Sequence, residues 1–352
     1  MSILVINSGS TSLKYKLFDN AEKEIKQGVF TDIASHETAI KNCLREIGDL
    51  RGIKAVGHRV VHGGDQFIKP TLINDEVLAE LEKFSDLAPL HNPYNIAGIK
   101  AVSGFLPETP QVAVFDTAFF ADLPEAAKIY ALPISMLDKY KIKRYGFHGI
   151  SHQFAMREAA KQLNRDVKKI NLITCHLGGG WSITAIKGGK PIDTSMGWTP
   201  LGGLVMMTRA GDLDPGIVVE LLRREEAKLH IGNLASIENI LNRESGIKGL
   251  SGGITDYQKL LREVSLGNKQ AKLAFDVAIY KLCKYIGAYW AILQGKVDAI
   301  VFTGAIGAGN PMTRNAVIAK LKFLNNIPAM AVKANEELMI AKEVRRRITH
   351  NA

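Results

Sequence analysis

The sequence predicts an α/β fold built from two related lobes. Apolar strand patterns alternate with amphipathic helix patterns along the chain, which is typical of α/β proteins. The segment 3–18 passes from an apolar strand through a turn of Asn, Ser, Gly and Thr into a second strand, and 172–189 repeats this order about half a chain later. The chain has 352 residues, more than one average domain. We therefore expect two lobes, with the linker near Gly149 and Ile150.

The first half of the chain predicts strands and helices in alternation after the opening hairpin. Residues 55–61 are apolar enough for a strand. The Asn-Asp pair at 74–75 would start a helix that ends at Phe84, with its apolar residues on one face. A short buried strand at 112–115 and a helix at 151–163 follow.

The second half predicts helices around one further strand. A long amphipathic helix covers 270–293, and the strand 300–302 runs into the glycine-rich sequence "TGAIGAG", which we expect to be a turn. Helices are predicted at 313–324 and 335–348, the latter with Asn335 as N-cap. Asp214 and Pro215 look like an N-cap and a first helical residue, so Arg209 would lie in the loop before that helix.

The composition bounds the classes of function. The formal net charge is +10 and the isoelectric point about 9.3, which suits a nucleic-acid-binding protein, a basic surface, or a site for anionic substrates. We favour the latter two interpretations, because the basic run 345–347 has no aromatic residues interleaved. The sequence has neither an apolar run of about 18 residues nor a signal-peptide pattern, so we expect no membrane partner. Its three cysteines, Cys43, Cys175 and Cys283, form no CxxC motif, which fits reduced thiols in the cytoplasm.

Several polar residues follow buried strands, where α/β proteins bind their ligands. Asn7 and Lys14 flank a small-residue turn that could hold phosphate, although by itself the stretch is better explained as an ordinary hairpin turn. Arg59 could bind a carboxylate or phosphate bidentately, or form a structural ion pair. Asp116 ends a buried strand, and His148 lies between glycines. The chain has no nucleophile elbow, Walker A motif or protein-kinase loop, and phosphoryl transfer fits this combination best.

At these residues the sequence resembles the acetate kinase family, which includes acetate and propionate kinases within the actin-like, sugar-kinase and Hsp70 ATPase group. The resemblance covers nearly the whole chain. It rests on ordered blocks: "LVINSGSTSLKY", "GHRVVHGG", "LAPLHNP", "VFDTAF", "RYGFHGISH", "HLGGGWSI", "DTSMGWTPL", "TRAGDLDPG" and "NEELMIA". It implies two actin-like (ribonuclease H-like) lobes with a cleft between them: an N-terminal lobe, 1–150, completed by a helix at 338–352, and a nucleotide-binding lobe, 151–337.

The resemblance also implies a reaction and its participants. Phosphate would pass directly and reversibly between ATP and acetate, or another short-chain carboxylate, with Mg²⁺ or Mn²⁺, giving acyl phosphate and ADP. The partners would be the carboxylate, the nucleotide and a second copy of the chain in a homodimer, with no nucleic acid. Arg59, Arg209, His148 and Asp116 would be catalytic, the two arginines gripping the carboxylate and the moving phosphoryl group. Asp116 would organise metal or water rather than accept a proton.

The remaining roles come from the same resemblance. Asn7 and Glu336 would address the metal, Glu336 together with Asp116. The carboxylate site would comprise Arg59, Val61, Leu90, His91, Phe147 and Pro200. The nucleotide site would comprise Lys14, His176, Gly178, Gly179, Gly180, Asp256, Tyr257, Gln258, Gly304, Ala305, Ile306, Gly307 and Ala308.

The chain departs from the family pattern mainly at the nucleotide end. Gly-Ile-Gly-Glu-Asn is usual where this chain has Ala305 to Gly309, Asp-Phe-Arg is usual at 256–258, and Trp181 stands where a small residue is usual. Gly179 and Gly202 replace a usual Asn and Glu, and 324–331 is shorter than usual. ATP stays the favoured donor. Another nucleotide, pyrophosphate, propionate or butyrate as partner, or a non-catalytic nucleotide-binding or nucleic-acid-binding role, are the alternatives.

Overall fold

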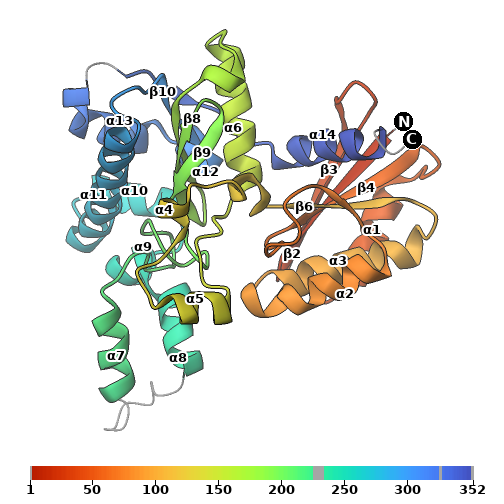
Figure 1. Ribbon diagram of the computed structural model, residues 1–352, viewed down its shortest axis with the longest axis horizontal. Coiled ribbons are helices and arrows are strands. Elements are labelled where there is room, and N and C mark those ends of the chain that lie inside the picture. The colour runs from red at the N-terminus through yellow and green to blue at the C-terminus, as the bar shows by residue number, and fades with distance from the viewer. Residues whose placement is uncertain (1, 225–233, 325–326, 350–352) are drawn as a thin grey trace. The chain divides into compact units, whose positions relative to one another are not determined.

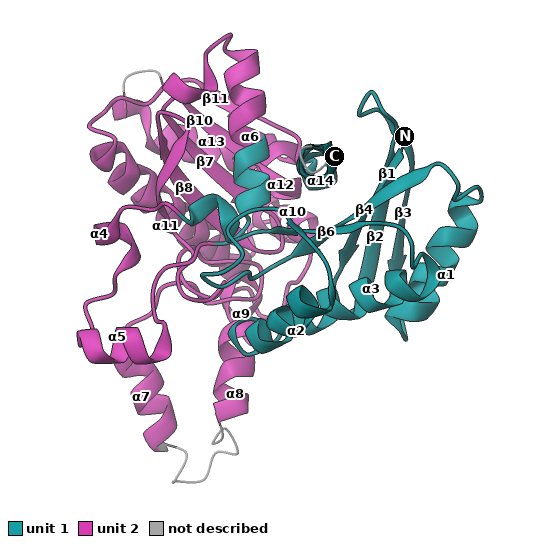
Figure 2. Cartoon of the chain, turned by 45° about the vertical axis from the view of Figure 1, so that its right-hand side comes forward, with its two compact units in different colours: residues 1–121, 147–154, 335–352 teal, residues 122–146, 155–334 magenta. Residues whose placement is uncertain are grey.

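The computed structural model describes residues 2–224, 234–324 and 327–349. The chain forms two compact units (Figures 1 and 2): the first contains 1–121, 147–154 and 335–352, and the second 122–146 and 155–334. The domain boundaries expected from the sequence stay a prediction. They differ from these units at three places, since 122–146 belongs to the second unit rather than the first, whereas 151–154 and 335–337 belong to the first rather than the second. Residues 350–352 of the predicted terminal helix lie outside the described part.

The first unit is built on a six-stranded sheet with the order β3-β2-β1-β4-β6-β5. β1 pairs antiparallel with β2 and parallel with β4, and β4 pairs parallel with β6. The predicted opening hairpin and the two following strands are confirmed, with bounds shifted by one to three residues. The strands are β1 (Ser2–Ser8), β2 (Ser12–Phe18), β3 (Glu24–Thr31), β4 (Ile53–Val60), β5 (Thr71–Leu72) and β6 (Gln111–Phe115).

Helices cover both faces of this sheet, and strand alternation decides which residue meets which helix. On one face Leu4 and Ile6 belong to a buried cluster with Cys43 of α1 (His36–Ile47) and with α3 (Asn92–Phe105). On the other face a Cβ at Gly57 would lie 2.7 Å from Val344 of α14 (Glu336–Thr349). α2 (Asp75–Lys83) packs beside α3, and its predicted N-cap Asn74 accepts a hydrogen bond from Val77 N. Side chains of β1 and β4 that lie on the same face of the sheet as Gly57 therefore point toward α14.

The second unit repeats the strand order of the first. Its sheet is β11-β10-β7-β8-β9, with β7 antiparallel to β8 and parallel to β10. The series β9-β8-β7-β10-β11 matches β3-β2-β1-β4-β6 in order and in every pairing direction. The internal repeat predicted from the two hairpins is thus confirmed. The strands are β7 (Leu172–Leu177), β8 (Trp181–Lys187), β9 (Lys190–Thr194), β10 (Ala299–Thr303) and β11 (Ala329–Ala331).

The structure corrects two predictions about the remaining helices. The sequence "TGAIGAG" was expected to be a turn but forms the short helix α12, and the helix predicted at 313–324 is α13 followed by a 3-10 turn at Lys322–Leu324. α13 starts earlier because Pro311 opens it and Asn310 Oδ1 accepts from Thr313 N at 2.9 Å. None of the described helices combines the length and the apolar character needed to cross a membrane. The α-helices not yet introduced are α4 (Glu125–Lys128), α5 (Ile134–Tyr140), α6 (Gly149–Gln162), α7 (Pro215–Arg224), α8 (Leu234–Asn239), α9 (Gly246–Leu250), α10 (Tyr257–Ser265), α11 (Lys269–Ile292), α12 (Gly304–Gly309) and α13 (Pro311–Lys320).

Candidate functional site

Three of the predicted site residues form a charged cluster in the first unit. Arg59 Nη2 donates to Asp116 Oδ2 at 2.6 Å, and Arg59 Nε lies 3.2 Å from both carboxylate oxygens. Arg59 Nη1 lies 3.3 Å from Glu336 Oε2. The side chains of Arg59, Asp116 and Glu336 are 18%, 2% and 14% exposed, so the cluster is largely shielded from water. These charged groups, gathered at the ends of neighbouring elements, form a candidate centre for binding a charged ligand.

The sheet and α14 together explain why these residues meet. Arg59 lies two residues after Gly57, so its side chain points to the face that α14 covers. Asp116 follows β6, which runs parallel to β4, and its backbone N–H donates to Val60 O at 3.0 Å. α14 begins at Glu336, and the predicted N-cap Asn335 accepts from Leu338 N at 3.2 Å. The cap thus sets where the first carboxylate of the helix lies.

The ion pairs determine the charge states of the cluster. Burial alone would lower the pKa of the Arg59 guanidinium, but Asp116 and Glu336 raise it above its ordinary value. Burial raises the pKa of the Asp116 carboxyl, and Arg59 opposes that shift. We therefore expect Arg59 to stay charged between the two carboxyl groups.

The segment 145–150 holds His148 beside this cluster. His148 has φ +58°, a left-handed conformation that is uncommon for a residue with a side chain, and its backbone forms a hydrogen bond to Asp116. Gly149 N donates to Asp116 O at 3.0 Å, and a Cβ at position 149 would collide with that carbonyl. The glycine thus lets the chain approach Asp116 closely, and Asp116 holds the neighbouring histidine in an unusual conformation.

The opening hairpin presents Asn7 and Lys14 together. These residues are partners in the β1–β2 register, so their side chains lie on the same face of the hairpin. That face is the one covered by α14, since Lys16 Nζ donates to Asn335 Oδ1 at 3.3 Å. By alternation, Asn7 and Arg59 therefore point to one face of one sheet. The structure brings these residues and Glu336 to the same side of the first unit.

Five of the six residues predicted for the carboxylate site belong to the first unit. Val61 and Phe147 are buried, and Leu90 and His91 are half-buried just before α3. Phe147 packs edge-on against His62 with ring centroids 5.6 Å apart. Pro200 belongs to the second unit, so its participation stays a prediction.

Two buried asparagines in this region were missed by the sequence reasoning. Asn92 and Asn95 lie in "HNPYN" at the start of α3, and their amides bond to the backbone of Val61, His62 and Ser8. They are 0% and 4% exposed. The only sequence signal was the presence of two asparagines on the first turns of an otherwise apolar helix.

In the second unit, the glycine turn 178–180 follows β7. Gly178 N donates to Gly180 O at 3.1 Å, and Met207 N donates to Gly179 O at 3.3 Å. Trp181, the departure from the family pattern, is fully buried and its indole N–H donates to Gly178 O at 3.0 Å. The large side chain therefore supports the turn from within the protein. His176 lies on β7 opposite Thr303, the last residue of β10.

The segment 256–258 starts α10, and two of its side chains have structural partners. Asp256 Oδ1 accepts from Lys259 N at 2.7 Å as an N-cap. The Tyr257 hydroxyl lies 2.9 Å from Thr313 Oγ1, and its ring packs edge-on against Trp181. Burial raises the pKa of Tyr257 to about 12. Gln258 is exposed.

α12 carries the predicted nucleotide residues Gly304 to Ala308. Gly304 has φ +80°, and a Cβ there would lie 2.5 Å from Leu177 O, so the helix begins directly against the end of β7. Arg314 Nη1 donates to Gly307 O and Ala308 O at 2.8 and 2.7 Å. This guanidinium satisfies carbonyls at the end of α12.

Arg209 lies in the loop before α7, as predicted. Asp214 Oδ1 accepts from Gly216 N at 2.8 Å, and Pro215 opens the helix. Arg209 Nη1 lies 3.5 Å from Pro200 O, and burial lowers the pKa of its guanidinium. Because Arg209 belongs to the second unit and Arg59 to the first, their joint action stays a prediction.

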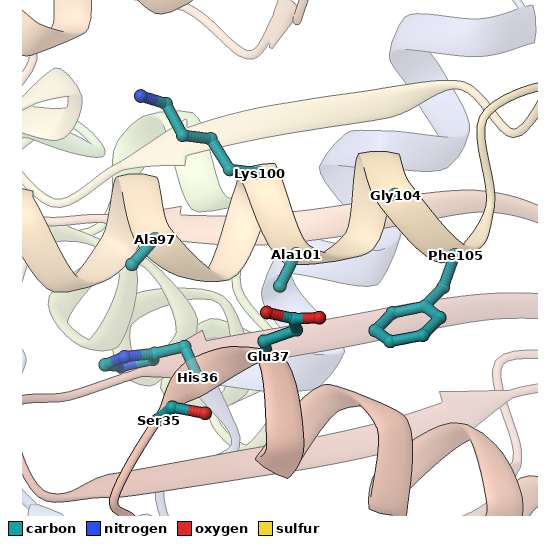
Figure 3. Close-up of a pocket in the computed structure, with 8 residues that line it drawn as sticks. All are labelled: Ser35, His36, Glu37, Ala97, Lys100, Ala101, Gly104 and Phe105. Carbon is teal, nitrogen blue, oxygen red and sulfur yellow. The ribbon is translucent and has the colours of Figure 1, made fainter.

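Two further observations concern possible ligands. Within 2–224, 234–324 and 327–349, no three or more His, Cys, Asp or Glu side chains are gathered as a metal site. A cavity of about 550 Å³ lies between α1 and α3 (Figure 3), but none of the predicted site residues lines it. The cavity is lined by Ser35, His36, Glu37, Ala97, Lys100, Ala101, Gly104 and Phe105.

Comparison with known proteins gives consistent results. The model of the acetokinase family matches residues 21–343. An acetate kinase of Symbiobacterium thermophilum is 43% identical over 97% of this chain and 98% of the relative. The structure is similar to a propionate kinase from Francisella tularensis (TM-score 0.91, 37% identity, 97% and 98% coverage) and to acetate kinase from Porphyromonas gingivalis (0.88, 35%, 99% of each). A ROK hexokinase from Thermus thermophilus, at 12% identity and TM-score 0.51 over 99% of this chain and 100% of the hexokinase, shares the fold.

Proposed function

Because this chain belongs to the acetokinase family and is a carboxylate phosphotransferase, we propose that it transfers phosphate directly and reversibly between ATP and acetate, or another short-chain acid. The observation that carries the proposal is the shielded cluster of Arg59, Asp116 and Glu336. The products would be acyl phosphate and ADP.

The residues of the first unit suit such a transfer. The Arg59 guanidinium can meet two oxygens of a carboxylate or a phosphoryl group at once, and its burial strengthens that attraction. An ionised carboxylate attacks without losing a proton, so Asp116 is not needed as a base. His148, held beside Asp116, would donate a hydrogen bond to the phosphoryl oxygens during transfer. Positioning and charge neutralisation are what phosphoryl transfer requires.

The donor set also fits a divalent cation. Mg²⁺ prefers oxygen ligands and is commonly held by one or two carboxylates together with substrate phosphates. Asp116 and Glu336 would supply those carboxylates. Asn7, on the same face, would contribute an amide oxygen, directly or through water. When bound, Mg²⁺ or Mn²⁺ would neutralise the charge on the transferred phosphate.

The second unit would bind the nucleotide. The glycine turn 178–180, His176 and α12 meet at the ends of β7 and β10, which is where α/β sheets bind ligands. Lys14 and Arg209 would add positive charge at the phosphates. Asp256, Tyr257 and Gln258 would lie near the base, and the hydroxyl of Tyr257 would remain with Thr313.

A homodimer in the cytoplasm is part of the same proposal. The dimer follows from the family resemblance, and the cytoplasm from the three unpaired cysteines. Light scattering at micromolar concentration would measure the mass: twice that of the chain is expected, and a monomer would contradict the dimer.

The identity of the acid is the least constrained point, and the similarity to a propionate kinase favours propionate as the second candidate. The decisive experiment is a panel of acetate, propionate and butyrate against ATP, GTP and pyrophosphate, with Mg²⁺ and hydroxylamine to trap acyl phosphate. We expect product with ATP and at least one acid. Product only with pyrophosphate would overturn the choice of ATP, and no product in any combination would overturn the proposal.

A further inference from the structure

Asn95 links two segments that carry predicted site residues. Its Oδ1 accepts from Val61 N at 3.0 Å, and its Nδ2 donates to Ser8 O at 2.7 Å. Ser8 follows Asn7 at the end of β1, and Val61 lies two residues after Arg59. A single buried side chain therefore ties the segment expected to meet phosphate to the segment expected to hold the carboxylate.

The two bonds need both halves of an amide. Ser8 is the last residue of β1, and Val61 follows the last residue of β4, so both backbone groups lie where the strands end. Asn95 is 4% exposed, so water has little access to replace a lost bond. A carboxylate of the same length could accept from Val61 but not donate to Ser8, and an apolar side chain could do neither.

The turn of the hairpin approaches α3 at a second point. A ring nitrogen of His36 lies 3.0 Å from Gly9 O, and the His36 ring stacks on Tyr94, the neighbour of Asn95, with centroids 5.9 Å apart. Figure 3 shows His36 in the wall of the α1–α3 cavity, on the side facing Ala97. One turn after Asn95, a Cβ at Gly98 would collide with the Ser8 hydroxyl. The close approach of the hairpin thus depends on a glycine at position 98.

Asn92 provides a natural comparison. It is also buried, and it lies one turn before Asn95 on the same helix. Its Oδ1 accepts from His62 N at 3.1 Å and its Nδ2 donates to His62 O at 3.0 Å, so it holds the segment after β4 but not the hairpin.

We infer that Asn95 is a positioning residue for the proposed reaction: it sets the spacing between Asn7 and Lys14 on the hairpin and Arg59 on β4. The inference rests on the proposed function. Each segment can still bind its own ligand when the link is lost, but the two ligands would no longer be held in register. Loss of the link therefore lowers kcat and leaves the KM for the acid nearly unchanged.

The test compares Asn95→Ala with Asn92→Ala in the full chain, after thermal unfolding has shown that each is folded. Asn95→Ala is expected to lower kcat for acyl phosphate formation by about tenfold or more, with KM for the acid within about threefold, since small misplacements of reacting groups cost large factors in rate. Asn92→Ala is expected to act mainly on KM. An unchanged kcat in Asn95→Ala, or the same kinetic pattern in both variants, would overturn the inference.

Hydrogen exchange provides a readout that does not depend on activity. Amides of residues 7–13 should exchange faster in Asn95→Ala and at the wild-type rate in Asn92→Ala, and equal rates in the two variants would overturn the inference. If wild-type protein makes no acyl phosphate at all, the proposed function fails while this measurement still decides the link. If Asn95→Ala does not fold, Gly98→Ala takes its place: it displaces the hairpin without removing the amide, and an unchanged kcat would contradict the inference.

Discussion

A buried histidine next to the candidate site predicts how stability depends on pH. His58 is 1% exposed on β4, and its ring nitrogen lies 2.7 Å from Gln111 Oε1. Burial lowers the pKa of His58 from 6.5 to about 4, and the Gln111 hydrogen bond opposes the shift only in part. As the pH falls below about 6.5 the unfolded chain binds this proton first, so folding stability is lost, and the loss is complete near the folded-state pKa of about 4.

The size of the effect follows from the shift. A difference of about 2.5 pKa units corresponds to about 3 kcal/mol in full, of which about 2 kcal/mol is lost on going from about pH 7.5 to pH 5. His58→Gln removes the proton-binding group, while its amide can still donate to Gln111. Between about pH 7.5 and pH 5 the free energy of unfolding of this variant should therefore fall by about 2 kcal/mol less than that of the wild type.

Urea unfolding followed by circular dichroism would measure the difference. Tryptophan fluorescence is unsuitable, because Trp181, Trp198 and Trp290 all belong to the second unit while His58 belongs to the first. If wild type and His58→Gln lose the same stability between the two pH values, the reasoning about His58 is wrong.

Three other substitutions test separate contacts. Gly149→Ala should lower kcat about tenfold or more, because its Cβ would push Asp116 away from Arg59; wild-type kinetics of the purified variant would contradict this role. Tyr257→Phe removes the hydroxyl contact to Thr313 and should lower the free energy of unfolding by about 1 kcal/mol, measured with urea; no loss would mean that the contact does not stabilise the fold. Asn335→Ala removes the N-cap of α14 and should cost about 1 kcal/mol in the same assay, and a stability equal to wild type would argue against the cap.

Local sequence patterns were sufficient where the physical cause is local. Short apolar stretches predicted β1, β2, β4 and β6, and the two similar hairpins predicted the internal repeat that appears in the strand orders of the two sheets. The helix caps Asn74, Asp214 and Asn335 could be predicted from the sequence because capping involves residues within one turn of a helix.

Features that depend on distant partners could not be predicted from patterns alone. The meeting of Arg59 with Glu336, 277 positions along the chain, depends on α14 packing across Gly57. "TGAIGAG" forms a helix rather than a turn because its glycines allow it to pack on the end of β7. Asn95 carried no signal of its own, since nothing in the sequence indicates which backbone groups a buried amide will reach.

The assignment of the reaction to the Arg59 cluster is tested most directly by acyl phosphate formation in Arg59→Ala. With the acid and donor that wild type uses best, Arg59→Ala should lose about 100-fold or more in kcat/KM, because it removes the buried positive charge that we propose binds the reacting anions. Arg51→Ala is the matched control, since Arg51 pairs with Asp49 on the exposed surface and should leave the rate unchanged. An Arg59→Ala enzyme as active as the Arg51→Ala control would contradict the account.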